Sequence, residues 1–170
     1  MIRIGFRWLF TLALFCLIPA FAADQSSWVF DSVRPSSSPS RSSVAPTDEE
    51  QVYTVILDQI KYWNAHDIEH YMDTYWKSPD LLVVSDARQI MGWAELLAAY
   101  KRGYPNLSEM GAATLQRVKL QRLSPEFFLS LTWYAVRLNG KDSYATDTMI
   151  FRKLPEGWKI INAHSSFLEP

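Results

Sequence analysis

Residues 114–166 read TLQRVKLQRLSPEFFLSLTWYAVRLNGKDSYATDTMIFRKLPEGWKIINAHSS. Much of this stretch is β-branched or aromatic, and it is interrupted by the short turn sequences 124–126, 139–141 and 154–157, which contain Pro, Asn and Gly. We therefore predict four strands, over residues 114–123, 127–138, 144–152 and 158–166. Because the turns are short, consecutive strands should pair as antiparallel hairpins in one sheet.

Helices are predicted ahead of this sheet. Thr47-Asp48-Glu49-Glu50 fits a capping box, and apolar residues follow at three- and four-residue spacings to about Trp63. Asp67 can cap a second helix, and a third runs from Trp93 to Tyr104, with short strands at 81–84 and 89–91 between them. The order α-α-β-β-α-β-β-β-β separates helices from a long antiparallel sheet, which predicts an α+β fold.

The N-terminal segment has the features of a targeting signal. Arg3 and Arg7 precede an apolar run of residues 8–18, and Ala20-Phe21-Ala22 provides a signal-peptidase site. The run is shorter than the ~20 residues of a membrane-spanning helix, which disfavours an uncleaved anchor, and the bulky residues before Cys16 disfavour lipidation. We expect a signal peptide at 1–22, a Ser/Pro-rich linker at 23–46 and one domain at 47–170. The mature protein would be periplasmic or extracellular, without a stable membrane anchor.

Charge and motif content limit the partners. The 170 residues contain 17 Lys and Arg against 18 Asp and Glu, so no basic face of the size that nucleic acid requires is expected. The sequence has no glycine-rich phosphate loop, and its one cysteine lies in the predicted signal. We therefore predict no nucleic-acid partner and no cofactor.

Several short motifs together resemble one superfamily. The sequence resembles the nuclear transport factor 2-like superfamily, and within it the exported SnoaL-like group, which is related to the association domain of calcium/calmodulin-dependent kinase. The resemblance covers about residues 48–168 and rests on Tyr62-Trp63-Asn64-Ala65-His66-Asp67, on residues 75–81, Gly92-Trp93, Tyr100, Gly103-Tyr104-Pro105, Met110-Gly111 and the ending 157–166.

The resemblance implies a cone-shaped fold. In such a fold a strongly curved antiparallel sheet wraps three helices, leaves a pocket at its open end, and often forms dimers through its outer face. Members include ketosteroid isomerases, polyketide cyclases, dehydratases and non-catalytic domains, so the fold alone does not select a function.

The last predicted strand supplies a candidate polar site. Strict alternation would place Trp158, Ile160, Asn162, His164 and Ser166 on one face, with a polar end formed by the last three. His164 is the candidate catalytic residue, because an imidazole can serve as a general base near neutral pH. The alternative is that His164 only ties the strand end to a helix through buried hydrogen bonds.

Aromatic residues supply the second candidate group. Tyr71, Tyr75, Trp93 and Tyr100 are expected to show an edge to the pocket together with Asn162 and Ser166, since flat side chains with polar tips suit an apolar ligand. The alternative is that these aromatic side chains only pack in the core.

Two further features of the sequence could indicate a metal site or a catalytic acid. Residues 66–70 spell H-x-x-E-H, an inverted zinc-protease motif, but His66 lies in a predicted helix break, so we expect no metal site. Asp147 is an acid within a predicted strand that could act as an isomerase base. Its neighbours match no isomerase motif, and we interpret it as a surface residue.

These observations predict an exported protein that binds a small, largely apolar molecule in an aromatic-lined pocket, without catalysis or with a reaction the sequence does not identify. The alternative function is a SnoaL-like or ketosteroid-isomerase-like acid–base enzyme: an isomerase, cyclase or dehydratase. A homodimer is also expected, because one sheet face would leave residues such as Phe128, Tyr134 and Val136 in water.

Overall fold

The computed structural model describes residues 45–85 and 88–168. The chain divides into two units, Met1–Ser42 and Ser43–Pro170, and all the described residues belong to the second unit. The predicted signal peptide and nearly all of the predicted linker therefore lie outside the described residues. Within the part that is described, no helix is both long and apolar enough to cross a membrane.

Three α-helices form as expected: α1 (Asp48–Asn64), α2 (Ile68–Met72) and α3 (Trp93–Gly103). The capping box is confirmed, because the Thr47 side chain accepts from Glu50 N at 3.2 Å and Glu50 Oε2 accepts from Thr47 N at 2.8 Å. Asp67 caps α2 as predicted, through a hydrogen bond from His70 N at 3.1 Å. Local sequence thus determines where α1 and α2 begin.

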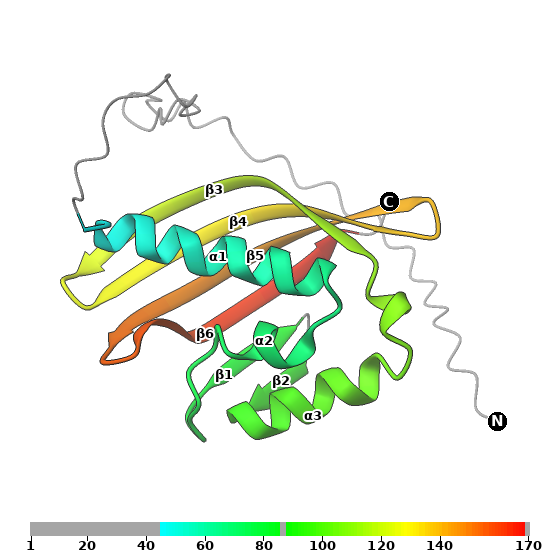
Figure 1. Ribbon diagram of the computed structural model, residues 1–170, viewed down its shortest axis with the longest axis horizontal. Coiled ribbons are helices and arrows are strands. Elements are labelled where there is room, and N and C mark those ends of the chain that lie inside the picture. Colours follow the sequence, from blue (N-terminus) through cyan, green and yellow to red (C-terminus); the bar gives the residue numbers. More distant parts are fainter. Residues whose placement is uncertain (1–44, 86–87, 169–170) are drawn as a thin grey trace, which may run out of the picture. The chain divides into compact units, whose positions relative to one another are not determined.

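The described strands form one six-stranded sheet in the order β2-β1-β6-β5-β4-β3. Their bounds are β1 Leu82–Ser85, β2 Arg88–Met91, β3 Ala112–Ser124, β4 Phe127–Leu138, β5 Lys141–Leu154 and β6 Gly157–Leu168, and a short 3-10 helix, η1 (Leu107–Met110), precedes β3. The long strands pair antiparallel, and α1 lies along them in Figure 1. The α+β class is confirmed.

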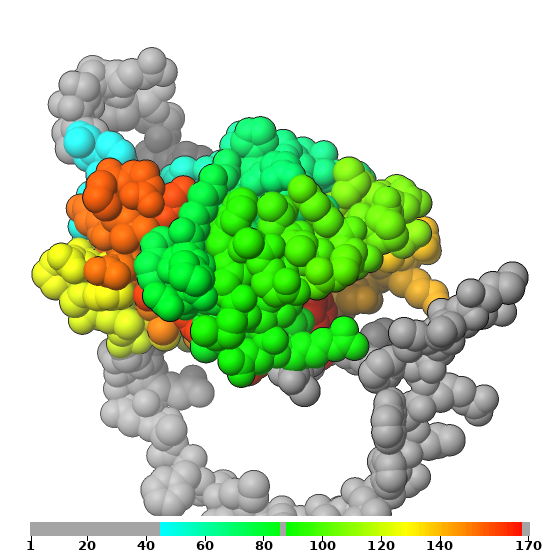
Figure 2. Space-filling model, turned by 90° about the horizontal axis from the view of Figure 1, so that it is seen from below, coloured from blue at the N-terminus to red at the C-terminus, as the bar shows by residue number. Residues whose placement is uncertain are grey.

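The sheet is mixed rather than wholly antiparallel. β1 pairs with β6 in parallel, with Leu82 beside Asn162 and Ser85 beside Ser165. The β1–β2 hairpin thereby extends the sheet beyond β6, and together with α3 it forms much of the face seen in Figure 2. This pairing joins segments about 80 residues apart, so no local turn sequence predicts it.

A β-bulge in β6 breaks the simple alternation of its side chains. Ile150 pairs with Asn162 but the next residue, Phe151, pairs with Ile160, so Ile161 is the extra residue. One extra residue moves every later side chain of the strand to the opposite face.

Because of the bulge, the side chains of β6 after Ile161 lie on the face opposite to the predicted one. Trp158 and Ile160, before the bulge, are buried at 3% and 0% exposure, whereas His164 and Ser166, after it, are exposed. The prediction that Asn162, His164 and Ser166 share a face with these two apolar residues is therefore wrong. The polar end of the strand faces away from the core.

The two faces of β4 are also opposite to expectation. Phe128 is 2% exposed and faces the helices, and Tyr134 and Val136 have the same parity. The prediction that these three side chains lie on the outer face is wrong. The outer face carries instead Leu131 and Trp133, with the Arg117 guanidinium 4.8 Å from the Trp133 ring centroid.

The apolar core lies between α1 and the inner face of the long strands. Val52 and Ile56 of α1 and Phe151 of β5 are at most 2% exposed, and the Phe128 and Trp158 rings pack edge-on with centroids 5.2 Å apart. This packing holds one end of the molecule closed.

Candidate functional site

Three tyrosine hydroxyls meet beside the sheet. Tyr71 lies on α2, Tyr100 on α3, and Tyr75 follows α2 at a bridge to Ile160. Tyr71 Oη lies 3.3 Å from Tyr75 Oη and 3.3 Å from Tyr100 Oη. Trp63 of α1 packs edge-on against Tyr71, with ring centroids 5.6 Å apart. The structure therefore brings together three of the four aromatic residues that were predicted to line a pocket.

An acid faces the same side of the sheet. Asp147 shares its parity on β5 with buried Ala145, Met149 and Phe151, so its carboxyl points towards the helices. Tyr134 Oη, on β4, donates a hydrogen bond of 2.5 Å to Asp147 Oδ2. Short hydrogen bonds of this kind are typical when the acceptor or donor carries charge.

The second oxygen of this carboxyl is unsatisfied. Asp147 Oδ1 is buried and makes no hydrogen bond of acceptable geometry with the described residues. Ser165 lies near enough to favour the ionised carboxyl, yet it does not complete that bond. A buried polar atom without a partner is uncommon in native proteins and often marks a functional position.

Burial controls the titration of this group. Desolvation raises the pKa of Asp147 above 3.8, and the Tyr134 hydrogen bond and the nearby Ser165 and His164 side chains oppose this rise. Desolvation also raises the pKa values of Tyr71 and Tyr100 well above 10.0, so their hydroxyls stay neutral. None of the ion pairs among the described residues includes Asp147. The site is an acid among neutral hydroxyls, with no paired cation.

Trp93 lies apart from the hydroxyl cluster. Its Nε1 donates to the Met72 backbone oxygen at 2.8 Å, which ties the start of α3 to the end of α2. Its ring also lies 5.2 Å from the Lys77 ammonium. These contacts explain Trp93 as a structural link, and its contact with a ligand stays a prediction.

The three predicted site residues of β6 do not join the tyrosines. Asn162 Nδ2 donates to the Leu82 backbone oxygen at 3.2 Å and so links β6 to β1. His164 and Ser166 are exposed, because the bulge turns them away from the helices. A role for any of them in ligand contact or catalysis stays a prediction.

The interpretation of Asp147 as a surface residue is wrong. The sequence contained a signal for its true position, because Ala145, Met149 and Phe151 share its parity in the predicted strand and are apolar. Tyr134 could have been found in the same way, since it lies on the same face of its strand as Phe128, Ser130 and Thr132. What the sequence could not give is the hydrogen bond between these two residues, which depends on the register that places Tyr134 opposite Ala145 and Asp147 opposite Thr132.

The H-x-x-E-H pattern does not form a metal site in the described part of the chain, where no cluster of His, Cys, Asp and Glu has suitable geometry. His66 adopts a positive φ of 57° at the turn after α1, while His70 Nδ1 lies 2.6 Å from Asp67 Oδ2. The second histidine, His70, thus contacts the N-cap residue of α2, and the motif residues form the start of that helix.

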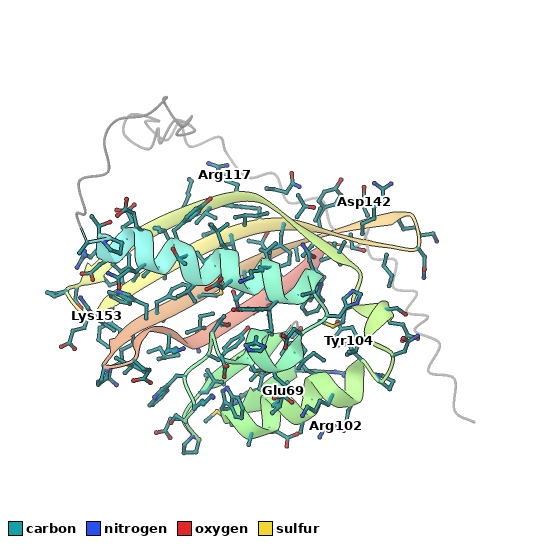
Figure 3. The ribbon with its side chains drawn as sticks, viewed as in Figure 1. Glu69, Arg102, Tyr104, Arg117, Asp142 and Lys153 are labelled. Atoms are coloured by element: carbon teal, nitrogen blue, oxygen red, sulfur yellow. The ribbon has the colours of Figure 1, made fainter. Side chains whose placement is uncertain are left out.

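Shallow clefts occur elsewhere on the described surface. One, of about 560 Å³, lies between the α1–α2 turn and the C-terminal end of α3, and Glu69 and Tyr104, two of its lining residues, are labelled in Figure 3. Another, of about 260 Å³, includes Lys77 and Lys159. Neither is lined by Asp147. We place the candidate site at Asp147. In the larger cleft the carboxylate of Glu69 already forms an ion pair with Lys101.

Comparison with solved structures identifies the fold. A nuclear transport factor 2-like protein of unknown function from Shewanella oneidensis MR-1 is 25% identical, with a TM-score of 0.68 over 71% of this chain and 99% of that one. A cystatin-like-fold domain of unknown function from Nostoc punctiforme PCC 73102 is 17% identical, with a TM-score of 0.63 over 72% and 78%. A nuclear transport factor 2-like protein from Burkholderia xenovorans LB400 is 22% identical, with a TM-score of 0.57 over 72% and 87%.

These likenesses define an α+β protein with the nuclear transport factor 2-like cone fold, as the sequence motifs predicted. No family model and no curated protein matches the sequence. These three proteins are described as being of unknown function, so the function has to be argued from the residues of this chain.

Proposed function

We propose that this protein binds a small, largely apolar molecule against the inner face of its sheet, beside Tyr71, Tyr100, Tyr134 and Asp147. One observation carries the proposal. The Tyr134–Asp147 hydrogen bond lies where a core made only for stability would hold apolar side chains, and Asp147 Oδ1 is left without a partner.

The cost of this arrangement supports a functional role. A buried donor or acceptor without a partner destabilises a protein by about 1–3 kcal/mol, and Val or Phe at these positions would avoid that cost. Tyr71, Tyr100, Tyr134 and Asp147 are each half-buried on the side of the sheet that faces the helices. Aromatic walls with a few converging polar groups are typical of small-molecule sites.

Calorimetric titration of the purified protein with benzyl alcohol tests the proposal. Binding should saturate, and Tyr100→Phe and Tyr134→Phe should each weaken it by about fivefold to tenfold, because each removes one hydroxyl contact. Tyr144→Phe is the matched control, since Tyr144 is 50% exposed on the outer face. Absence of saturable binding, or equal effects of all three substitutions, would contradict a site at this position.

A second candidate function is acid–base catalysis of the SnoaL-like or ketosteroid-isomerase-like kind, as an isomerase, cyclase or dehydratase. The raised pKa of Asp147 favours it, because a carboxyl that titrates closer to neutral pH transfers protons more effectively. We therefore propose Asp147 as the acid–base candidate in place of exposed His164, and its hydrogen bond with Tyr134 supports this proposal.

Proton exchange provides a test of catalysis. If Asp147 is a general base, the protein should speed deuterium uptake beside the carbonyl of cyclohexenone in D₂O, as followed by NMR. Asp147→Asn should slow the catalysed exchange by about 10²- to 10⁴-fold, whereas His164→Gln should not. Exchange no faster than in buffer would remove this candidate for simple ketones and leave the binding proposal intact.

Export and dimerisation are proposed on separate grounds. The A-x-A site predicts a mature chain that begins at Ala23, which mass spectrometry of the protein from its native source would check. The outer face, with Leu131 and Trp133, offers apolar surface for a second copy of the chain. Trp133→Lys should then shift sedimentation from dimer to monomer, and a wild-type protein that sediments only as a monomer would refute the dimer.

A further inference from the structure

Hydroxyl groups lie close to the Asp147 carboxyl on two neighbouring strands. Tyr134 Oη bonds to one carboxyl oxygen, and Ser165 lies near the carboxyl from the neighbouring strand. Tyr75 and Tyr100, from the helical side, lie near enough for the Asp147 charge to raise their pKa values further. A set of hydroxyls with one carboxyl offers many acceptor lone pairs to a ligand.

Among the described residues, no ion pair balances the charge of this carboxyl. The lysines and arginines that form ion pairs in the described residues use other partners, such as Asp48, Asp73 and Glu69. The nearby basic residue is His164, which is exposed on the outer face, where solvent weakens its influence on Asp147. Ionised Asp147 would therefore be an isolated charge, which is costly in a buried position.

We infer that the ligand carries a protonated amine that pairs with Asp147, so that the site selects an organic cation over a neutral or anionic molecule of the same shape. The inference rests on the proposed function and names its ligand class. An ammonium group has three donors and no acceptor, which matches a lining of oxygens. It would complete the carboxyl's hydrogen bonds and supply the missing positive charge.

The aromatic residues favour the same ligand class. Tyr71, Tyr100 and Trp63 pack edge-on to one another, with Trp63 and Tyr100 ring centroids 6.3 Å apart. Aromatic faces attract organic cations through their quadrupoles, and their apolar edges suit the hydrocarbon part of an amine. An anion would meet the opposite field, because ionised Asp147 repels it.

Ammonium binding should also depend on pH. Ionised Asp147 binds the cation, so affinity should fall as pH is lowered through its raised pKa. The groups that face Asp147 are Tyr134 from β4, Ser165 from β6, and Tyr75 and Tyr100 from the helical side, and His164 acts on it from the outer face. Tyrosines with raised pKa values stay neutral in this range, and His164→Gln removes the imidazole.

The test compares benzylamine, benzyl alcohol and benzoate by calorimetric titration at neutral pH. These probes share a ring and one methylene or carboxyl carbon, and they differ in charge. We expect benzylamine to bind about tenfold more tightly than benzyl alcohol, the effect of one charge-assisted hydrogen bond, and benzoate to bind most weakly. In Asp147→Asn this preference should disappear while benzyl alcohol still binds, because the shape of the site is kept.

The outcomes separate this inference from the proposed function. Equal affinities of benzylamine and benzyl alcohol for the wild type would overturn the inference and leave the binding site standing, whereas no binding of any probe would overturn both. If Asp147→Asn does not fold, a pH series of benzylamine affinity with the His164→Gln variant, which keeps Asp147, decides instead. An ammonium affinity that does not fall at acid pH would then contradict pairing with Asp147.

Discussion

The two ends of the inner sheet face differ in what they bury. Beneath the first half of α1, β4 and β5 contribute Phe128 and Phe151, which are 2% and 0% exposed. Further along the same two strands, the same parity carries Tyr134 and Asp147, which are half-buried and polar. Because one pair of strands carries both sets, the contrast comes from side-chain choice, and it separates a part of the sheet that stabilises from a part that can bind.

The charged groups differ in the same way. At the closed end, Asp48 at the start of α1 lies 2.6 Å from Lys153 Nζ and 3.0 Å from an Arg122 guanidinium nitrogen. Asp147, in contrast, has one neutral hydrogen-bond partner and no paired cation in the described residues. One acid is therefore satisfied, and the other is left available.

The largest effect is expected where the core is closed. Phe151→Ala should lower the free energy of unfolding by about 3–5 kcal/mol, because it removes a fully buried ring and leaves a cavity. Urea denaturation followed by tryptophan fluorescence measures the change, with Phe127→Ala on the half-buried outer face as the matched control. A loss below about 1 kcal/mol would mean that this end is not tightly packed.

At the polar end, replacement of the Tyr134–Asp147 pair by apolar side chains should stabilise the protein. The double substitution Tyr134→Phe with Asp147→Val replaces a partly satisfied polar pair by apolar groups that suit a strand interior. We expect a gain of about 1 kcal/mol in the free energy of unfolding, together with loss of benzylamine binding. A folded double variant that is less stable than the wild type would show that the pair contributes to stability, and the contrast between the two ends would fail.

The pH dependence of stability should have opposite signs at the two acids. The paired cations hold the pKa of Asp48 at about 2, so its contribution is present above 3.8 and is lost as pH falls through about 2. Burial raises the pKa of Asp147, so its contribution is present below 3.8 and is lost as pH rises through the raised value.

Urea titrations across pH distinguish these contributions. Asp48→Asn should remove stability that the wild type has at neutral pH and flatten the acid side of the profile. Asp147→Asn should instead remove the decline in stability above the ordinary carboxyl pKa. Two variants with profiles of the same shape would contradict the assignment of opposite shifts to these acids.

Local sequence signals explain why most of the fold could be predicted. The capping box at Thr47, the cap at Asp67 and the turn at Asn139-Gly140 each act through neighbouring residues, and each element forms where expected. The parallel pairing of β1 with β6 depends on contacts between distant segments, and no local pattern encodes it. The extra residue at Ile161 is likewise visible only when the partner strand is in place.

The candidate site was predicted in part for the same reason. Tyr71, Tyr75 and Tyr100 were identified because aromatic residues at helical spacing are legible in a sequence. His164 was assigned the wrong face because strict alternation was assumed across the bulge. Asp147 lies on the same face of its strand as Met149 and Phe151, and the sequence alone shows this. The face that an acid shares with apolar residues therefore predicts its burial better than the absence of a known motif around it.

The smallest effect is expected at His164, and it sharpens the contrast between the inner and outer faces. Because His164 is exposed, His164→Ala should change the free energy of unfolding by no more than about 0.5 kcal/mol and leave benzylamine affinity within about twofold. Asn162→Ala is the control on the same strand, since it removes a hydrogen bond to Leu82 O and should cost about 0.5–1.5 kcal/mol. Thermal and urea unfolding with calorimetric titration measure both quantities. If His164→Ala kept its stability but lost affinity, the outer face of β6 would contribute to the site, and the division between a binding face and a solvent face would have to be redrawn.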